Sequence, residues 1–304
     1  MPAFAGMSGR RSGAMEYFIY IGTLIAIYTT LTISLNLLVG YTGLISIAQA
    51  GIYGVGAYVT ALLALHVTHD LLISFVLAAI SGVLVSLIVA LPSLRLQNEY
   101  FLIATLGFQA IIFSLFMNLD ITGGASGLYG VPHPTLFGHT IRLGWQKFLI
   151  AAALAIVCYL LALRITNAPF GRLLRAVRED QTAVAALGKS VFRIKLSVFV
   201  FSAVFAAAAG TIYVYSLTAL DPVAFGLDES IFIITLVIVG GTGSLNGAVL
   251  ATALLILLPE TFKFLAIPDA IAPQLRQVLY GLLLVFFTRY RRQGLIGEYR
   301  DVLK

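Results

Sequence analysis

The sequence predicts an all-α polytopic membrane protein with eight to ten transmembrane helices. Of the 304 residues, 60% are hydrophobic and only 11% are charged, which leaves too little charge to cover a soluble domain of this length. Several apolar runs reach the roughly 20 residues that a helix needs to cross a hydrocarbon core about 30 Å thick. These runs lack the alternation of strands, and an apolar segment in lipid satisfies its backbone groups within a helix.

Nine apolar segments follow one another along the chain. They lie at about 17–39, 43–65, 71–91, 100–117, 148–164, 196–217, 230–239, 248–258 and 274–287. The seventh and eighth are short enough to be broken helices. We expect an N-terminal tail at 1–15, one transmembrane domain at 16–290 and a cytoplasmic tail at 291–304.

The first segment is expected to be a retained span, because it is too long for a signal peptide and lacks a convincing cleavage site. Arg10 and Arg11 precede it, and Met15 opens a natural-looking start. Residues 1–14 are therefore expected to be a disordered tail or to lie outside the native chain.

The second segment is rich in glycine in its first half, with Gly43, Gly51, Gly54 and Gly56 within fourteen residues. Non-helical backbone is tolerated at membrane depth only where protein or a water-filled cavity satisfies it. We therefore expect a re-entrant or broken element that lines a pathway.

Basic residues set the orientation of the spans. They gather at 164–195 and again in the tail from Arg289 onward, and both regions are expected to be cytoplasmic by the positive-inside bias. The four segments between them give an even number of crossings, so the two placements agree. The loop at Asp221–Glu229 then falls outside and leans acidic, which fits this orientation. At the front, Arg95 and the Arg10–Arg11 pair are both expected inside, although three segments separate them. Either the N-terminus is outside, or the second segment does not cross as a simple helix.

A second glycine-rich stretch, Gly240–Gly247, precedes the eighth segment. Paired glycine-interrupted segments in the two halves of a transporter indicate an internal repeat and a central site. The alternative is that both stretches are small-residue packing faces, as the spacing of Gly243 and Gly247 by four allows.

No catalytic constellation stands out, and we predict no enzymatic activity, no metal site and no nucleic-acid partner. Lys189 and Ser190 end a stretch like a phosphate-binding loop, but Ala183 stands where that motif needs glycine. Cys158, the single cysteine, lies in an apolar run as a packing residue. The spans are almost free of ionisable groups, which an ion-driven carrier usually needs. The energy for any transport is therefore expected from a partner.

The cytoplasmic stretch 167–188 is the sharpest local feature. Pro169 suits the first turn of a helix, and Gly188 suits a helix end. Leu173, Leu174 and Val177 fall on one side and arginines on the other, which predicts a short amphipathic helix. Its alternatives are a solvated loop that enforces topology, or a helix lying on anionic lipid.

Four blocks of sequence occur in order between about residues 31 and 297. They are Ser34 through Tyr58; Tyr100–Phe108 with Thr122–Leu128; Gly171–Gly188; and Gly240–Ser244 with Leu258-Pro259-Glu260 and the tail Arg292–Gly297. As an ordered set they resemble the branched-chain amino-acid ABC transporter permeases, specifically the LivM-type subunit. The third block resembles the EAA-type loop of that family. The chain departs from the family pattern at Gln109, where glutamate is common, and at Ala248, where proline usually follows the glycines.

The resemblance implies the fold of an ABC importer permease, in the bacterial inner membrane and in contact with lipid. It implies a homologous second permease subunit, two cytoplasmic ABC ATPases and a periplasmic substrate-binding protein as partners. ATP and Mg²⁺ would be held by the ATPases, with no cofactor in this chain. Coupling to the ATPases would fall to the loop at about 166–192, through Gly171, Arg172, Arg175, Arg178, Glu179, Ala185, Ala186 and Gly188.

Candidate substrate-pathway residues are polar side chains beside glycine-rich or apolar walls. They are Asn36, Gln49, Tyr53, Thr105, Gln109, Asn118 and Thr122. Each has a rival role in hydrogen bonding between helices. Glycines expected to shape the backbone around them are Gly43, Gly51, Gly54, Gly123, Gly124, Gly241 and Gly243.

Two other functions stay open. The same machinery would import urea, short amides or a sugar, because specificity in such importers rests largely with the binding protein. An ion-gradient-driven secondary carrier would work without any ATPase. A membrane-embedded enzyme is disfavoured for want of a convergent nucleophile, acid–base pair or metal set.

Overall fold

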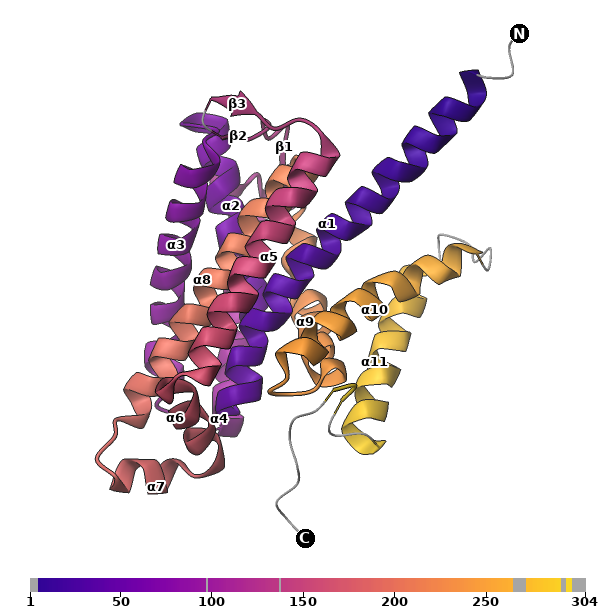
Figure 1. The fold of residues 1–304 in the computed structure, drawn as a ribbon. Coiled ribbons are helices and arrows are strands. Elements are labelled where there is room, and N and C mark those ends of the chain that lie inside the picture. The colour runs from indigo at the N-terminus through magenta and orange to yellow at the C-terminus, as the bar shows by residue number, and fades with distance from the viewer. Residues whose placement is uncertain (1–4, 97, 137, 265–271, 291–293, 297–304) are drawn as a thin grey trace.

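The computed structural model describes residues 5–96, 98–136, 138–264, 272–290 and 294–296. Long helices run along the molecule (Figure 1). Five helices contain a stretch long and apolar enough to cross a membrane: α1 (Ala5–Thr42), α3 (Leu71–Ser93), α4 (Asn98–Asn118), α5 (Gly144–Asn167) and α8 (Val191–Leu217). Four shorter helices accompany them: α2 (Gln49–His66), α9 (Leu227–Gly240), α10 (Leu245–Phe264) and α11 (Ala272–Tyr290). The predicted all-α polytopic membrane fold is confirmed.

The core of the bundle lies where α8 and α1 pack with α2. In the apolar stretch of α8, 72% of the residues are buried, against 61% in α1 and only 17% in α5. Small residues bring α2 and α8 together, because a Cβ atom on Gly56 would stand 2.7 Å from the carbonyl carbon of Ala207. The outer helix α3 instead exposes Val76, Ile80 and Leu84. Such an apolar outer surface suits lipid rather than water.

Two helices of the bundle begin in its interior. After α1 the chain turns at Gly43, whose φ of +72° favours glycine, and residues 44–48 are non-helical before α2 starts at Gln49. In the second half, the 3₁₀ turn η3 (Pro222–Phe225) leads into α9, and Phe225 is fully buried. The glycine-rich second segment is therefore a broken element, as predicted.

The second interior break does not lie where the sequence suggested. Gly241–Ser244 is the turn between α9 and α10, and it lies at the end of the bundle. Gly240 and Gly247 pack against each other there, since a Cβ on Gly240 would stand 2.8 Å from Gly247 backbone. The stretch 240–247 forms this turn between two helices, and its glycines pack together as the alternative expected. The interior break is formed by η3, which carries proline and phenylalanine instead.

Two short helices lie at one end of the bundle and a set of short turns and strands at the other (Figure 1). The first end carries α6 (Pro169–Glu179) and α7 (Gln181–Ala186). The opposite end carries η1 (Asp120–Thr122), η2 (Gly124–Ser126), β1 (Leu128–Tyr129), β2 (Thr135–Leu136), β3 (His139–Thr140) and β4 (Ala219–Leu220). Strands β1 and β4 pair antiparallel with Leu128 opposite Leu220, and β2 pairs antiparallel with β3.

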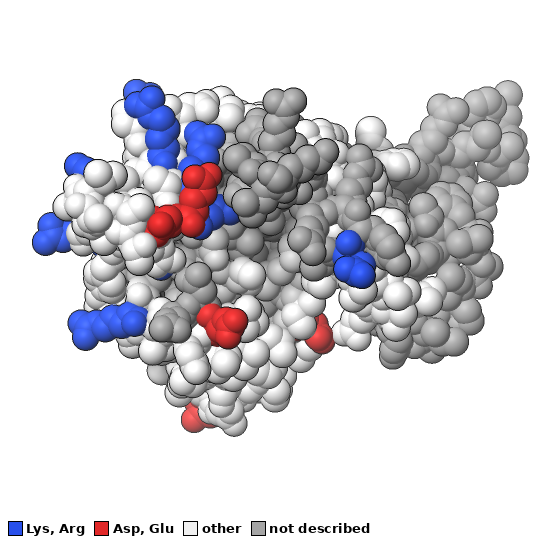
Figure 2. All heavy atoms as spheres, turned by 90° about the horizontal axis from the view of Figure 1, so that it is seen from below, with Lys and Arg blue, Asp and Glu red and all other residues white. Residues whose placement is uncertain are grey.

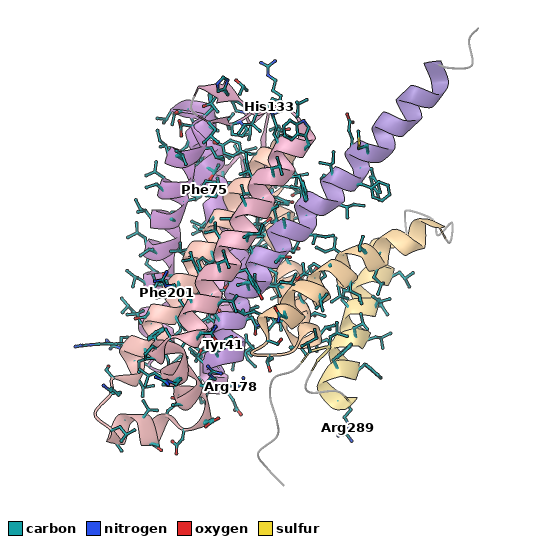
Figure 3. All side chains as sticks on the ribbon, in the orientation of Figure 1. Tyr41, Phe75, His133, Arg178, Phe201 and Arg289 are labelled. Atoms are coloured by element: carbon teal, nitrogen blue, oxygen red, sulfur yellow. The ribbon has the colours of Figure 1, made fainter. Side chains whose placement is uncertain are left out.

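Basic side chains gather at the end that holds α6 and α7, which we call the basic end (Figure 2). Arg289, near the end of α11, lies at the same level (Figure 3). The prediction that the loop at 164–195 and the C-terminal part lie on the same side is therefore confirmed.

The start of α1 lies at the end opposite α6 and α7 (Figure 1). The expectation that Arg10 and Arg11 share a side with Arg95 was therefore wrong, and the alternative of an N-terminus on the other side holds. Three helices, α1 to α3, separate the two positions, and an odd number of crossings places them at opposite ends. A pair of charges before the first span did not outweigh the larger basic cluster.

The expected terminal tails differ from the fold in one respect. Helix α1 begins at Ala5, so most of the stretch 1–15 continues the first helix. Of the tail 291–304, residues 294–296 are described, and the N–H of Leu295 donates to the carbonyl of Val239 over 2.9 Å. Residues 1–4, 291–293 and 297–304 lie outside the described part of the chain, as does Arg292 of the fourth sequence block.

Candidate functional site

The loop at the basic end folds as two helices rather than one. Leu174 and Val177 of α6 are fully buried while Arg172 is exposed, so the predicted amphipathic helix is confirmed. The chain then extends at Asp180, whose carboxylate accepts the N–H groups of Thr182 over 2.8 Å and Ala183 over 3.1 Å. The hydroxyl of Thr182 also donates to this carboxylate. This bond in the first place, and the two N–H bonds after it, lower the pKa of Asp180. Asp180 is thus the N-cap of α7.

The predicted coupling residues separate into an exposed group and an anchoring group. Those exposed at the tip are Arg172, Glu179, Ala185, Ala186 and Gly188. Leu187, which the sequence did not single out, is 79% exposed between them. Gly171 is buried instead, because a Cβ there would stand 2.5 Å from the carbonyl carbon of Thr166. Leu187 therefore projects from the tip, beyond the end of the bundle.

Two predicted coupling residues hold α6 to the foot of α1. Arg178, which is partly buried, donates to the carbonyl of Gly40. Arg175, although exposed, donates to the carbonyl of Thr166 over 3.1 Å and lies 6.0 Å from the ring centre of Tyr41. Tyr41 and Arg178 are neighbours at this foot (Figure 3). These arginines therefore connect the short helices to the bundle.

Asn36 continues this connection from α1 to the turn between α9 and α10. Its Nδ2 donates to the carbonyl of Ser244 over 2.9 Å, and its Oδ1 accepts the N–H of Gly243 over 2.9 Å. The side chain is completely buried. Both ends of the amide are thereby used in joining chain segments, which is the rival role foreseen for this candidate pathway residue.

Gln109 of α4 joins the two interior breaks. Its Oε1 accepts the N–H of Gly51 over 2.7 Å, and its Nε2 donates to the carbonyl of Phe225 over 2.8 Å. The N-terminal N–H groups of a helix and the groups of a non-helical turn have no partner within their own segment. One buried amide therefore satisfies a backbone group from each break.

Thr105 and Ser230 complete the support of the first break. Thr105 accepts the N–H of Ile47 over 3.2 Å, and Ser230 donates to the carbonyl of Ile47 over 2.5 Å. Ser230 also accepts the N–H of Ala50 over 3.3 Å. Ser230 was not predicted as a site residue, since a lone serine near a helix start carries no distinctive signal. Its position shows that the first turn of α9 lies against the start of α2.

Gln49 and Tyr53 keep polar atoms that no group of the described chain satisfies. The Nε2 of Gln49 donates to Ser34 over 2.5 Å and to Ser202 over 3.3 Å, but its Oε1 is buried without a partner. The hydroxyl of Tyr53 is buried without a partner as well. Buried polar atoms of this kind are rare and call for a functional explanation.

The last two candidate pathway residues lie away from this interior. Asn118 is exposed at the end of α4 and donates to the carbonyl of Ser114 over 2.8 Å. Thr122 is buried in η1 and donates to the carbonyl of Phe116 over 2.9 Å. The structure therefore brings together Gln49, Tyr53, Thr105 and Gln109 around the start of α2.

The glycines expected to shape the backbone do so in two ways. Gly51 and Gly54 give room for side chains, because Cβ atoms there would stand 2.7 Å from Oε1 of Gln109 and 2.6 Å from the ring of Phe116. The others adopt positive φ: Gly43, Gly123, Gly124, Gly241 and Gly243.

An apolar groove of about 690 Å³ lies between α1, α5 and α10. Its walls include Gly22, Phe148 and Ala155, and Tyr159 donates to Asn246 at one side over 2.5 Å. None of the candidate pathway residues lines it. The groove is therefore separate from the polar interior described above.

Glu229 lies in a different place from the one that its sequence neighbours suggested. It was assigned to an outer acidic loop, but it lies in the first turn of α9, next to Ser230, and one of its carboxylate oxygens is buried. Tyr28 of α1 packs edge to face on Phe232, which lies one turn further along α9, with ring centres 5.4 Å apart.

The chain matches known proteins over most of its length. Residues 17–288 match the family described as branched-chain amino acid transport system / permease component. The high-affinity branched-chain amino acid transport system permease protein LivM of Escherichia coli is 33% identical over 308 residues, which cover 93% of this chain and 71% of the relative. A probable branched-chain amino acid transport permease protein LivM of Methanocaldococcus jannaschii is 30% identical, over 75% of this chain and 68% of the relative.

A second kind of permease is also similar. The LivH permease protein of the Escherichia coli high-affinity branched-chain amino acid transport system is 26% identical over 255 residues, which cover 77% of this chain and 80% of the relative. No solved structure matches the chain.

Proposed function

The chain belongs to the branched-chain amino acid transport permease family, and on this premise we propose that it is the membrane-spanning permease subunit of an ATP-driven ABC importer. Its cargo would be branched-chain or related amino acids, carried across the bacterial inner membrane. The observation that supports this most is the family match across residues 17–288, which includes every helix of the bundle core.

The partners follow from the same premise. A second, homologous permease subunit would lie beside this chain, since LivM and LivH relatives are both named as permeases of one Escherichia coli transport system. Two ABC ATPases would bind at the basic end and would hold ATP and Mg²⁺. A periplasmic binding protein would deliver the amino acid at the opposite end. By the positive-inside bias the basic end is the cytoplasmic one.

Helices α6 and α7 would form the contact with the ATPases. The exposed tip carries Leu187 with Ala185 and Ala186 on one short segment, an apolar surface that lies outside the apolar bundle. Exposed apolar side chains on a water-facing end are stabilised when a partner protein covers them. Glu179 and Arg172 at the rim would select the orientation of the contact through charge.

Movement of α6 would reach the bundle through three successive connections. Arg178 holds the carboxyl end of α1 at Gly40, and the next turn at Gly43 begins the interior break. Asn36, one turn earlier in α1, holds the turn that contains Gly243. A displacement of α6 would therefore act on the first interior break and on the turn between α9 and α10, and ATP binding and hydrolysis would bias the bundle between two arrangements.

Co-purification of the native complex tests this proposal. The chain would be isolated from its own membranes as the wild type, as Leu187→Glu, and with Glu179 or Gly188 replaced. We expect a second permease and two ATPases with the wild type and loss of the ATPases with Leu187→Glu, because burial of a charge at an interface centre is costly.

Val67→Glu is the matched control, because Val67 is 75% exposed before α3 at the opposite end. It should leave the ATPases bound. A chain that purifies without any ATPase from gently solubilised membranes, yet still carries amino acid, would contradict the proposal.

A further inference from the structure

Glu229 stands beside the first interior break rather than in an outer loop. The next residue, Ser230, exchanges hydrogen bonds with the backbone of Ile47 and Ala50, on either side of the start of α2. The carboxylate of Glu229 therefore lies where α1, α2 and α9 meet. Charged side chains at such positions in a membrane protein are rare and usually mark a pathway.

The carboxylate of Glu229 is only partly satisfied. Its Oε1 is buried and has no hydrogen-bond partner in the described part of the chain. The hydroxyl of Tyr53, a side chain only 1% exposed, likewise has none. Ser230, the residue after Glu229, accepts the N–H of Ala50, and Tyr53 lies one turn further along α2. Two unsatisfied polar atoms thus lie in one buried neighbourhood.

Aromatic rings enclose this neighbourhood. The rings of Tyr53 and Tyr213 pack edge to face with centres 5.4 Å apart, and Phe225 lies 5.2 Å from Tyr53. On the other side Tyr28 packs edge to face on Phe232 with centres 5.4 Å apart. Aromatic faces attract cations, and tyrosine rings beside a carboxylate form a site of the kind that holds an organic ammonium group.

The composition of the site favours an ammonium group over a metal ion. Metal cations such as Ca²⁺ take six to eight oxygen ligands. In the described ranges of the chain no three His, Cys, Asp or Glu side chains gather. An ammonium group needs up to three acceptors, and Oε1 of Glu229 and the hydroxyl of Tyr53 offer two.

We propose that Glu229, with the hydroxyl of Tyr53 and the rings of Tyr28 and Tyr213, receives the α-ammonium group of the amino acid during its passage. This inference rests on the proposed function and adds to it a recognition site within the permease. The site would discriminate against cargo that lacks an amino group, because the carboxylate would then stay unpaired in a buried place.

The test measures leucine uptake per ATP hydrolysed in proteoliposomes that hold the complete importer, with leucine-loaded binding protein outside. Glu229→Gln removes the charge and keeps the shape, and Tyr53→Phe removes only the hydroxyl. Asp228→Asn is the control, because Asp228 is the exposed acidic neighbour on the same helix turn. Assembly and ATP hydrolysis stimulated by the binding protein are followed in parallel, since a merely structural defect would lower them too.

We expect Glu229→Gln to lower leucine uptake per ATP by about tenfold or more, as the loss of a charge-assisted hydrogen bond implies. Tyr53→Phe should lower it by about fivefold, the share of a neutral hydrogen bond. Asp228→Asn should keep the wild-type ratio.

An unchanged leucine uptake per ATP in Glu229→Gln would overturn the inference. A fall in wild-type uptake when choline replaces sodium would also overturn it, because the site would then hold a metal cation. If Glu229→Gln does not assemble, Tyr53→Phe decides in the same way. Wild-type importer that shows no ATP-driven leucine uptake would instead refute the proposed function itself, and this inference with it.

Discussion

The amide of Gln109 provides the sharpest test of how the broken helices are held. We consider Gln109→Leu, which keeps a side chain of similar volume and removes both hydrogen bonds. The N–H of Gly51 and the carbonyl of Phe225 would each lose a partner at distances of 2.7 Å and 2.8 Å. Gln109 is only 2% exposed, so water does not readily replace the lost bonds.

The expected cost follows from these two orphaned groups. A buried backbone group left unsatisfied costs about 1–3 kcal/mol, so the variant should lose about 2–6 kcal/mol of unfolding free energy. Hydrogen bonds between membrane helices average only about 0.6 kcal/mol, because the reference state finds other partners. The larger figure applies here because both groups belong to backbone at a helix start or a non-helical turn.

Equilibrium unfolding in mixed micelles with increasing SDS measures this cost. Asn118→Leu is the matched control on the same helix, since Asn118 is exposed and bonds only within α4. Its effect should stay within about 0.5 kcal/mol. Equal stability of the two variants would refute the view that Gln109 supports the interior breaks.

Three further outcomes follow from the structure. Gly54→Ala should destabilise the chain by about 1–3 kcal/mol through overpacking, whereas Gly107→Ala, with nothing within 4 Å of its added Cβ, should be neutral or slightly stabilising in the same unfolding assay. In vesicles that hold this chain without the ATPases, Leu187→Cys should react with an impermeant maleimide only when the vesicles are inside-out, and Val67→Cys only when they are right-side-out. Background should be low because Cys158 is 2% exposed, and labelling of both from one side would contradict the topology. Because hydrogen bonds lower the pKa of Asp180, its cap stabilises α7 fully above the unfolded pKa of about 3.9, and this stability is lost as the pH falls through the lower folded value. Hydrogen exchange of the α7 amides should therefore accelerate, relative to the intrinsic rate, at acid pH in the wild type and be fast at every pH in Asp180→Ala.

The interior break of the first half was predictable, and that of the second half was not. The first break carries Gly43 and Gly51, and glycines so placed in an apolar run indicate backbone that departs from a continuous helix. The second carries Pro222 and Phe225, which look in sequence like an ordinary loop between spans. Gly241 and Gly243 have positive φ in a turn at the bundle end, and sequence alone does not separate such turn glycines from glycines at membrane depth.

Helix α6 was predictable from its amphipathic pattern, while the exposed surface that follows it was not. Leu174 and Val177 follow a helical period, and both are fully buried. Leu187 follows no such period, and only the fold shows that it projects beyond the bundle. Glu229 illustrates the opposite error, because neighbouring acidic residues suggested solvent and the long-range contact of Ser230 with Ile47 placed it in the interior.

The measurement that bears most directly on the proposed function is amino-acid uptake by purified protein in proteoliposomes under two energy sources. The complex of this chain with its second permease and ATPases should accumulate leucine only with ATP on the side of α6 and α7 and binding protein on the other. Sodium or proton gradients alone should give no uptake. Accumulation by this chain alone under an ion gradient, without any ATPase, would contradict the account and identify a secondary carrier.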